Sequence, residues 1–290
     1  MNLFQRNAKL IVVFAMISGS TSGILGKLIT AGSMTIGFYR LSFCLPFFIV
    51  PLLIKHRKDI IDINKKQLIL CALGGVFLFG HFFCWYVAVK NTVIASAIIL
   101  AGLHPLVVIL FMFVFFRKRT PAKAMAGLFI ALTGGILVAG MDYSFAGSNV
   151  FGNFMAFGAA LCMGLYFCIG NIVREKMNAG VYIFFVFFFC WACFTAGMLL
   201  TKTPFAGYPL SDYIWLVVMT LLCQFGAHAV LNWSLGYVSS LYVSAIETGE
   251  IVSAMILAFI VLSQVPTPWQ MAGAAAVIIG LVYYNRHDLK

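Results

Sequence analysis

The sequence predicts an all-α integral membrane protein with ten transmembrane helices, arranged as two inverted five-helix repeats with both termini in the cytoplasm. The first observation behind this fold class is composition, because 63% of the 290 residues are hydrophobic and only 9% are charged. The second is a series of long apolar runs, which replace the amphipathic patterns of soluble helices. The third is an uneven placement of positive charge. Together these observations exclude a soluble domain.

Ten apolar runs are long enough to cross a bilayer, which takes about 20 helical residues. The first run follows basic residues as in a signal peptide. It has span length and no small-residue cleavage site, so we expect a retained helix. The expected spans are 8–27, 34–53, 67–89, 92–116, 122–141, 150–171, 181–201, 213–233, 239–262 and 267–284.

Positive charges set the expected orientation of these spans. With a cytoplasmic N-terminus, every lysine and arginine falls in a cytoplasmic segment except Lys27, Arg40, Lys90 and Lys202. This is the positive-inside pattern of membrane proteins. The net charge of +11 therefore orients the helices, and it is not a reason to expect nucleic acid as a partner. Anionic lipid headgroups are an expected additional contact.

The two halves, 1–145 and 146–290, resemble each other. Gly127 and Gly134 in the fifth span match Gly273 and Gly280 in the tenth at a constant shift of 146 residues. Because five spans is an odd number, the second copy must enter the membrane from the opposite side, as in transporters with inverted repeats. We expect these small residues to let helices pack closely. The sequence leaves open whether they pack within one chain or across a homodimer.

Acidic residues inside the ninth span are the strongest functional signal. A carboxylate at mid-membrane costs about 2.5–3.5 kcal/mol, and Glu247 and Glu250 place two of them on one face of a continuous helix. Burial and like charge disfavour ionisation of both, so a shared proton or a bound cation is expected. The shift of 146 maps His104 onto Glu250, which suggests a proton or cation relay. The alternatives are a structural role for the glutamates and a neutral His104 bonded to a carbonyl that Pro105 frees.

Other polar and aromatic side chains within the spans are candidates for lining a cavity, although packing inside the bundle is the alternative for each. An aromatic lining with carboxylates suits an amine, through cation–π attraction, and also a flat apolar metabolite. Arg40 is also a candidate for this pathway, and it lies about two turns from the outer end of its span, from where its stem can snorkel outward. The further candidates are His81, Trp85, Tyr166, His228, Asn232, Trp233 and Tyr242.

Several short motifs resemble those of EamA-type transporters of the drug/metabolite transporter superfamily. They are Gly19-Ser20, Phe38-Tyr39-Arg40, Leu103-His104-Pro105 and the Ala-Gly-(six)-Gly end of each half. The resemblance covers the whole chain. It implies a bacterial inner-membrane carrier, commonly an exporter of amino acids or related metabolites, that works without ATP hydrolysis. The chain departs from the family where it reads Arg117-Lys118, Ser263-Gln264 and Gly249-Glu250-Ile251.

We therefore expect a secondary transporter of small metabolites such as amino acids or amines, working by alternating access with proton coupling. No phosphate-binding GxxxxGK[ST] loop or HExxH motif occurs, so neither a nucleotide-driven pump nor a metal or cofactor site is expected. The eight cysteines, including Cys190 and Cys193, lie inside spans and are expected to be packing residues. A membrane-embedded enzyme and a lipid-carrier flippase remain the alternatives.

Overall fold

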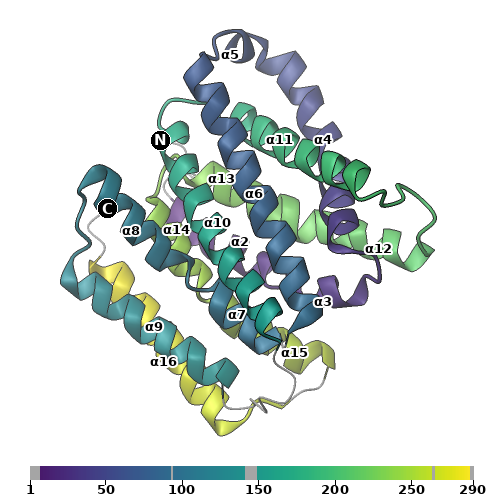
Figure 1. Cartoon of the computed structure of the whole chain (residues 1–290). Helices are drawn as coiled ribbons and strands as arrows, with labels where there is room; N and C mark the ends of the chain where they lie inside the picture. The colour runs from purple at the N-terminus through teal and green to yellow at the C-terminus, as the bar shows by residue number, and fades with distance from the viewer. Residues whose placement is uncertain (1–6, 93, 141–148, 263–264, 288–290) are drawn as a thin grey trace.

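The structure is a computed structural model that describes residues 7–92, 94–140, 149–262 and 265–287 (Figure 1). Within these ranges the secondary structure is helical and contains no strand. The expected boundary between the two halves, at 145/146, lies outside the described residues. The first half contains α2 (Ala8–Gly19), α3 (Ser22–Leu28), α4 (Ser33–Lys55), α5 (Arg57–Ile61), α6 (Lys65–Asn91), α7 (Ile94–Ala101), α8 (His104–Phe116) and α9 (Ala122–Gly140).

The second half contains α10 (Val150–Arg174), α11 (Ala179–Leu200), α12 (Leu210–Met219), the π-helix η2 (Thr220–Ala229), α13 (Val230–Ser234), α14 (Ser240–Glu247), α15 (Glu250–Leu262) and α16 (Pro268–His287). Eight helical stretches in the described residues are long and apolar enough to cross a membrane, and α9 adds a shorter apolar helix. The chain is therefore a multi-pass membrane protein.

Short polar side chains define where several helices begin. Asn64 Oδ1 accepts a hydrogen bond from Gln67 N at 2.9 Å, and Gln67 Oε1 accepts one from Asn64 N at 3.1 Å. This reciprocal pair satisfies two backbone donors that the first turn of α6 leaves unpaired. Asn149, Asn178 and Ser239 cap α10, α11 and α14 in the simpler one-sided way.

Three of the expected continuous helices are broken. The first span divides between α2 and α3, the fourth between α7 and α8 at 102–103, and the ninth between α14 and α15 at 248–249. At the last two breaks, Leu103 N bonds Leu100 O at 3.3 Å and Gly249 N bonds Ile246 O at 2.9 Å, so the turn tightens to an i→i−3 pattern. These two breaks lie 146 residues apart, at equivalent positions of the repeats.

The break in the ninth span changes the geometry expected for its carboxylates. Glu247 ends α14 and Glu250 begins α15, so the two side chains do not follow the spacing of one continuous helix. The eighth span also differs from an ordinary α-helix, because Thr220–Ala229 forms a π-helix. Such wider turns are rare and frequently occur at functional sites.

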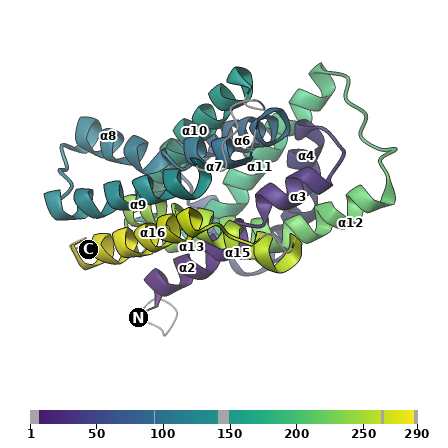
Figure 2. The same cartoon turned by 90° about the horizontal axis from the view of Figure 1, so that it is seen from below.

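Helices α9 and α16 lie side by side and antiparallel in both views (Figures 1 and 2). A Cβ added to Gly127 would lie 2.8 Å from Gly280 O, and one added to Gly134 would lie 2.7 Å from Gly273 O. The shift of 146 exchanges these two contacts, as a two-fold relation between the halves requires. The expected close packing of small residues is therefore present, and it occurs within one chain.

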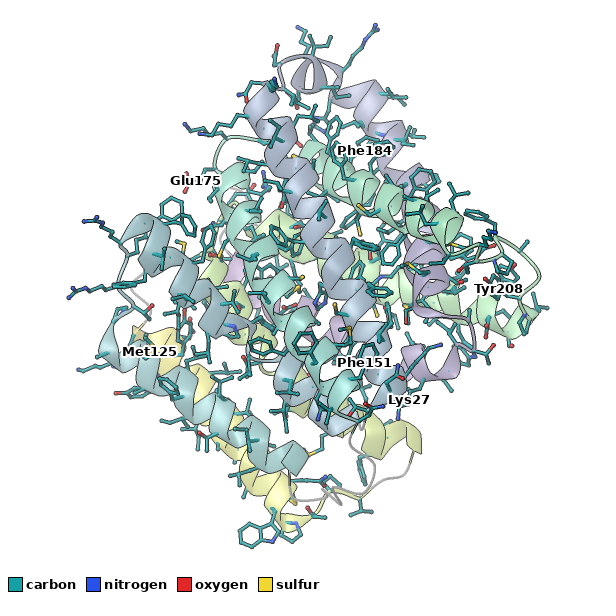
Figure 3. All side chains as sticks on the ribbon, in the orientation of Figure 1. Lys27, Met125, Phe151, Glu175, Phe184 and Tyr208 are labelled. Atoms are coloured by element: carbon teal, nitrogen blue, oxygen red, sulfur yellow. The ribbon has the colours of Figure 1, made fainter. Side chains whose placement is uncertain are left out.

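The other long helices also pair across the two halves, with α6 against α10, α4 against α11 and α2 against η2. Gly80 of α6 faces Cys162 of α10, while Gly158 of α10 faces Cys84 of α6, so this pair is antiparallel too. Lys27, at the end of α3, and Glu175, just after α10, lie at opposite ends of the bundle (Figure 3). The cavity described below lies between these paired helices.

Candidate functional site

A cavity inside the bundle is lined by residues from both halves of the chain. Its walls come from α2, α3, α4, α6, α7, α8 and α9 in the first half and from α10, η2, α14 and α15 in the second. The breaks in the fourth and ninth spans both face it, through Gly102, Leu103 and Thr248. Among the residues that the sequence singled out, those lining the cavity are Arg40, His81, Trp85, His104, His228, Glu247 and Glu250.

The histidine and one glutamate meet where the two broken helices approach each other. His104 Nδ1 is 2.6 Å from Ser244 Oγ of α14, so its partner is a side chain from the other half and not a carbonyl freed by Pro105. His104 Nε2 lies 3.9 Å from Glu247 Oε2, which is an ion-pair distance when the ring is protonated and too long for a hydrogen bond. The pair is mostly withdrawn from solvent, with side-chain exposures of 8% and 10%.

Glu247 and Glu250 occupy opposite helix ends. Glu247 ends α14, where exposed carbonyl groups disfavour a negative charge, and Glu250 begins α15, where backbone N–H groups favour one. Between them, Thr248 is buried and its Oγ1 has no hydrogen-bond partner within the described residues. Sequence reasoning did not identify Ser244 or Thr248, although both are hydroxyl side chains within two turns of the glutamates.

Arg40 points into the bundle, which corrects the expectation that it snorkels outward. It is 1% exposed, and its guanidinium contacts side chains of α6 and η2. Arg40 Nε donates to Gln224 Oε1 at 2.6 Å and Nη1 donates to Tyr86 OH at 2.7 Å. The guanidinium also lies 4.1 Å from the centroid of the Phe82 ring. Gln224, a polar residue in an apolar span, is a further contact that sequence reasoning missed.

Two more histidines from different halves lie beside this arginine. His81 Nδ1 is 3.1 Å from Ala159 O, so this nitrogen carries the hydrogen and donates it. The ring centroids of His81 and His228 are 6.1 Å apart, and His228 packs edge-on against Phe82 at 4.8 Å. His228 Nδ1 is buried and has no hydrogen-bond partner in the described part of the chain. Trp85 also lines the cavity, and its Nε1 donates to Ser22 Oγ at 3.2 Å.

Four candidates from the sequence do not line the cavity. Tyr166 OH donates to Asn232 Oδ1 at 2.6 Å in a buried contact between α10 and α13. Trp233 packs against the ring of Tyr237 at 4.8 Å, and Tyr242 OH donates to Lys9 O at 3.2 Å. The structure therefore places them in the packing around the cavity, and their part in a transport pathway stays a prediction.

A second charged cluster, which sequence reasoning missed, fixes the connection between α3 and α4. Asp212 of α12 is buried and accepts hydrogen bonds from Thr30 N at 3.0 Å, Thr30 Oγ1 at 2.8 Å and Ala31 N at 2.9 Å. Lys90 Nζ donates to the Ile29 carbonyl at 3.2 Å and to that of Ala31. In the sequence, this cluster is visible only as Asp212, a single acidic residue at the start of an apolar run.

A comparable cluster lies at the other end of the bundle, where Arg174 ends α10. Its Nε donates to Asn232 O at 3.2 Å, its Nη2 to Trp233 O at 3.3 Å and its Nη1 to Met177 O. Each cluster thus uses a cation to hold backbone carbonyls of its own half, Lys90 in the first half and Arg174 in the second. Across the residues described, no group of three or more His, Cys, Asp or Glu is placed to hold a metal ion, and each cysteine is a free thiol.

A helical multi-pass protein whose two antiparallel halves enclose a cavity with ionisable groups has the architecture of a secondary transporter. Residues 7–140 and 150–286 each match the EamA-like transporter family. The chain belongs to this family, and the resemblance read from its motifs, including membership of the drug/metabolite transporter superfamily, is confirmed.

Comparison with solved structures supports the same fold. A crystal structure, titled only "Crystal structure of protein", superposes with a TM-score of 0.77 over 98% of this chain and 98% of that chain. The sequence identity is 18%, so the likeness concerns the fold alone. A search of curated proteins gave no match.

Proposed function

We propose that this protein is a secondary transporter that exports small metabolites, such as amino acids or amines, across the bacterial inner membrane by alternating access. The observation that carries the proposal is the cavity between the halves, where His104, Glu247 and Glu250 lie at equivalent helix breaks. Ionisable side chains within membrane helices are costly and mark substrate or ion pathways. Inverted repeats place such a site at their interface, where rocking of one half against the other opens it to each side in turn.

Protons are the coupling ion in this proposal. A carrier that exports against a gradient without hydrolysing a nucleotide must use the gradient of another species. His104 Nε2 and Glu247 Oε2, 3.9 Å apart, are neighbouring positions that a proton can occupy, and Glu250 is a third in the same cavity. The aromatic walls at Phe82 and Trp85 suit the amino group of a substrate through cation–π attraction. Membrane lipids surround the bundle, and no nucleic acid or cofactor enters this scheme.

The proposed topology has ten crossings, both termini in the cytoplasm, and halves that meet near 144–148. The distribution of lysine and arginine supports it, as does the antiparallel packing of α9 with α16. The test uses single cysteines at Ser148 and Lys123 in a chain whose own cysteines are replaced. A membrane-impermeant thiol reagent added to intact cells should label position 148 and leave position 123 unlabelled. The reverse pattern would reject the topology.

The transport proposal is tested first by ligand binding and then by exchange. Purified protein is heated with amino acids, amines or nucleosides, because a ligand that binds only the native state raises the melting temperature. Compounds that raise it are then loaded into proteoliposomes. We expect these compounds to exchange across the membrane and to accumulate when a pH gradient is imposed. Empty liposomes should show neither activity, and Glu175→Gln, which changes an exposed carboxylate, should behave as wild type. Compounds that bind without exchanging would contradict a transport function.

A further inference from the structure

Arg40 is a buried cation without a carboxylate partner. Two of the three nitrogens of its guanidinium bond only the neutral groups of Gln224 and Tyr86. Among the described residues, the only ion pairs within 4.0 Å are His56 with Asp59 and His104 with Glu247. A buried charge without a counter-charge is costly, so this arrangement indicates that the counter-charge is supplied by a ligand.

The third guanidinium nitrogen is buried and makes no hydrogen bond to the described residues. Arg40 Nη2 has no hydrogen-bond partner in the described part of the chain, and the arginine lines the cavity. The contact of the guanidinium with the Phe82 ring fixes its position without using a hydrogen bond. Arg40 Nη2 is therefore a hydrogen-bond donor that is fixed in position and has no partner among the described residues.

His228 supplies a second unused polar atom on the same wall. Its ring packs edge-on against Phe82, the ring that Arg40 also contacts, and its buried Nδ1 has no partner among the described residues. His81, at a ring distance of 6.1 Å, is committed through Nδ1 to Ala159 O. Arg40 and His228 thus line the cavity from α4 and η2, each with one side-chain nitrogen that has no partner among the described residues, whereas Glu247 and Glu250 line it from α14 and α15.

We infer that Arg40 Nη2 and His228 Nδ1 bind an anionic group of the transported molecule. The inference rests on the proposed transport function and narrows its substrate class. The transported molecule carries a carboxylate or a similar anion as well as any amino group, and its two charges contact different residues of the cavity lining. Simple amines, which lack the anion, leave Arg40 uncompensated and bind more weakly.

The first experiment needs no knowledge of the substrate. The melting temperature of the purified full chain is measured against sodium acetate and sodium chloride, with the bulky anion gluconate at equal ionic strength as reference. We expect acetate to give a saturable increase. In Arg40→Gln and in His228→Phe the apparent affinity for acetate should fall by about tenfold or more, while Lys27→Gln, which removes an exposed cation of α3, should stay within about twofold of wild type.

Each outcome of this titration decides the inference. Equal responses to acetate and gluconate, or an unchanged response in His228→Phe, would overturn it. His228→Phe keeps the ring contact and breaks no hydrogen bond of Nδ1, so it remains informative if Arg40→Gln does not fold. Stabilisation by chloride without any by acetate would identify an inorganic ion as the occupant and would overturn the assignment to a transported carboxylate.

The second experiment separates this inference from the transport proposal. Alanine and phenylalanine are compared with their amides and with ethylamine and phenethylamine, in binding and in proteoliposome exchange. We expect the amino acids to bind about tenfold or more tightly than the amides and amines, and this preference to shrink in His228→Phe. Equal exchange of amines and amino acids would overturn the anion site while leaving transport intact. If none of the six compounds binds or exchanges, these substrates are rejected, and the acetate titration still decides the anion site.

Discussion

The fourth and ninth spans have the same backbone and different chemistry. Both break one residue before an ionisable side chain that starts the next helix, His104 at α8 and Glu250 at α15. Their hydrogen bonds also correspond, since Leu106 N bonds Leu103 O at 3.0 Å and Val252 N bonds Gly249 O at 3.0 Å. Duplication therefore accounts for the architecture of the cavity, whereas its charges belong to each half separately.

The direction of a helix determines which charge its backbone favours at each end. The start of a helix favours a negative charge, so the backbone supports a carboxylate at Glu250 and opposes a positive charge on His104. The ninth span adds Glu247, which has no acidic counterpart in the fourth. The pseudo-symmetric cavity thus has its two carboxylates on the second half only, while its one lining arginine among the described residues, Arg40, comes from the first half. Substitutions at equivalent positions of the two halves should show whether packing and charge contribute equally in each half.

Substitutions in the symmetric packing of α9 and α16 should reduce stability more than any other variant considered below. A leucine at Gly127 or Gly273 inserts side-chain atoms where even a Cβ at Gly127 would lie 2.6 Å from Tyr284 N, so the helices must separate. We expect each variant to lose about 3 kcal/mol of stability and most of its folded yield in size-exclusion chromatography.

The two glycine variants should behave alike, because the shift of 146 exchanges their environments. Gly32→Leu is the matched control, since a Cβ at Gly32 meets no atom within 4 Å. The surviving folded protein should keep its substrate preference. Normal yield together with altered preference would show that these helices line the pathway instead of supporting it.

A smaller effect is expected at the connection held by Asp212. In Asp212→Asn the amide nitrogen replaces an oxygen that accepts from Thr30 Oγ1 and Ala31 N, which leaves buried donors facing a donor. The free energy of unfolding should fall by about 2 kcal/mol in thermal or denaturant unfolding. The exposed Asp59→Asn is the control. Equal stability of both variants would show that this cluster does not hold the junction between α3 and α4.

The smallest effect is expected at the link between the two broken spans. Ser244→Ala removes the 2.6 Å contact with His104 Nδ1 and should cost about 1 kcal/mol of stability. Ser253→Ala, where the hydroxyl's hydrogen-bond partner among the described residues is Met16 Sδ at 3.3 Å, should change stability less. A larger loss at Ser253 than at Ser244 would indicate that the His104 contact contributes nothing to joining the halves.

Much of the fold was predictable because apolar length and charge placement act locally. The repeat was visible in Gly127, Gly134, Gly273 and Gly280, since close helix packing demands small residues whatever surrounds them. The breaks were not predictable, because glycine and proline are tolerated inside membrane helices and Gly102 alone does not end one. The π-helix at Thr220–Ala229 has no recognised sequence pattern in this span.

The sequence predicted several residues of the candidate site, but it predicted their directions and contacts less well. Buried charge identified Glu247, Glu250 and His104, since such residues are costly in a bilayer. The inward direction of Arg40 depends on Gln224, which is distant in sequence, so a pattern confined to its own helix could only suggest snorkelling. Tyr166 has the composition of a cavity residue but bonds Asn232 within the packing.

In the proposed mechanism, Glu247 and Glu250 couple protons to substrate movement across an architecture that is otherwise symmetric. The most direct test compares wild type with Glu250→Gln and Glu247→Gln in proteoliposomes, using substrate exchange and pH-driven accumulation side by side. We expect Glu250→Gln to abolish accumulation while exchange persists, because binding and alternation survive when only proton exchange is lost. A parallel loss of exchange would assign Glu250 to substrate binding. Unchanged accumulation in both variants would contradict the account and leave the two carboxyl groups with a structural role.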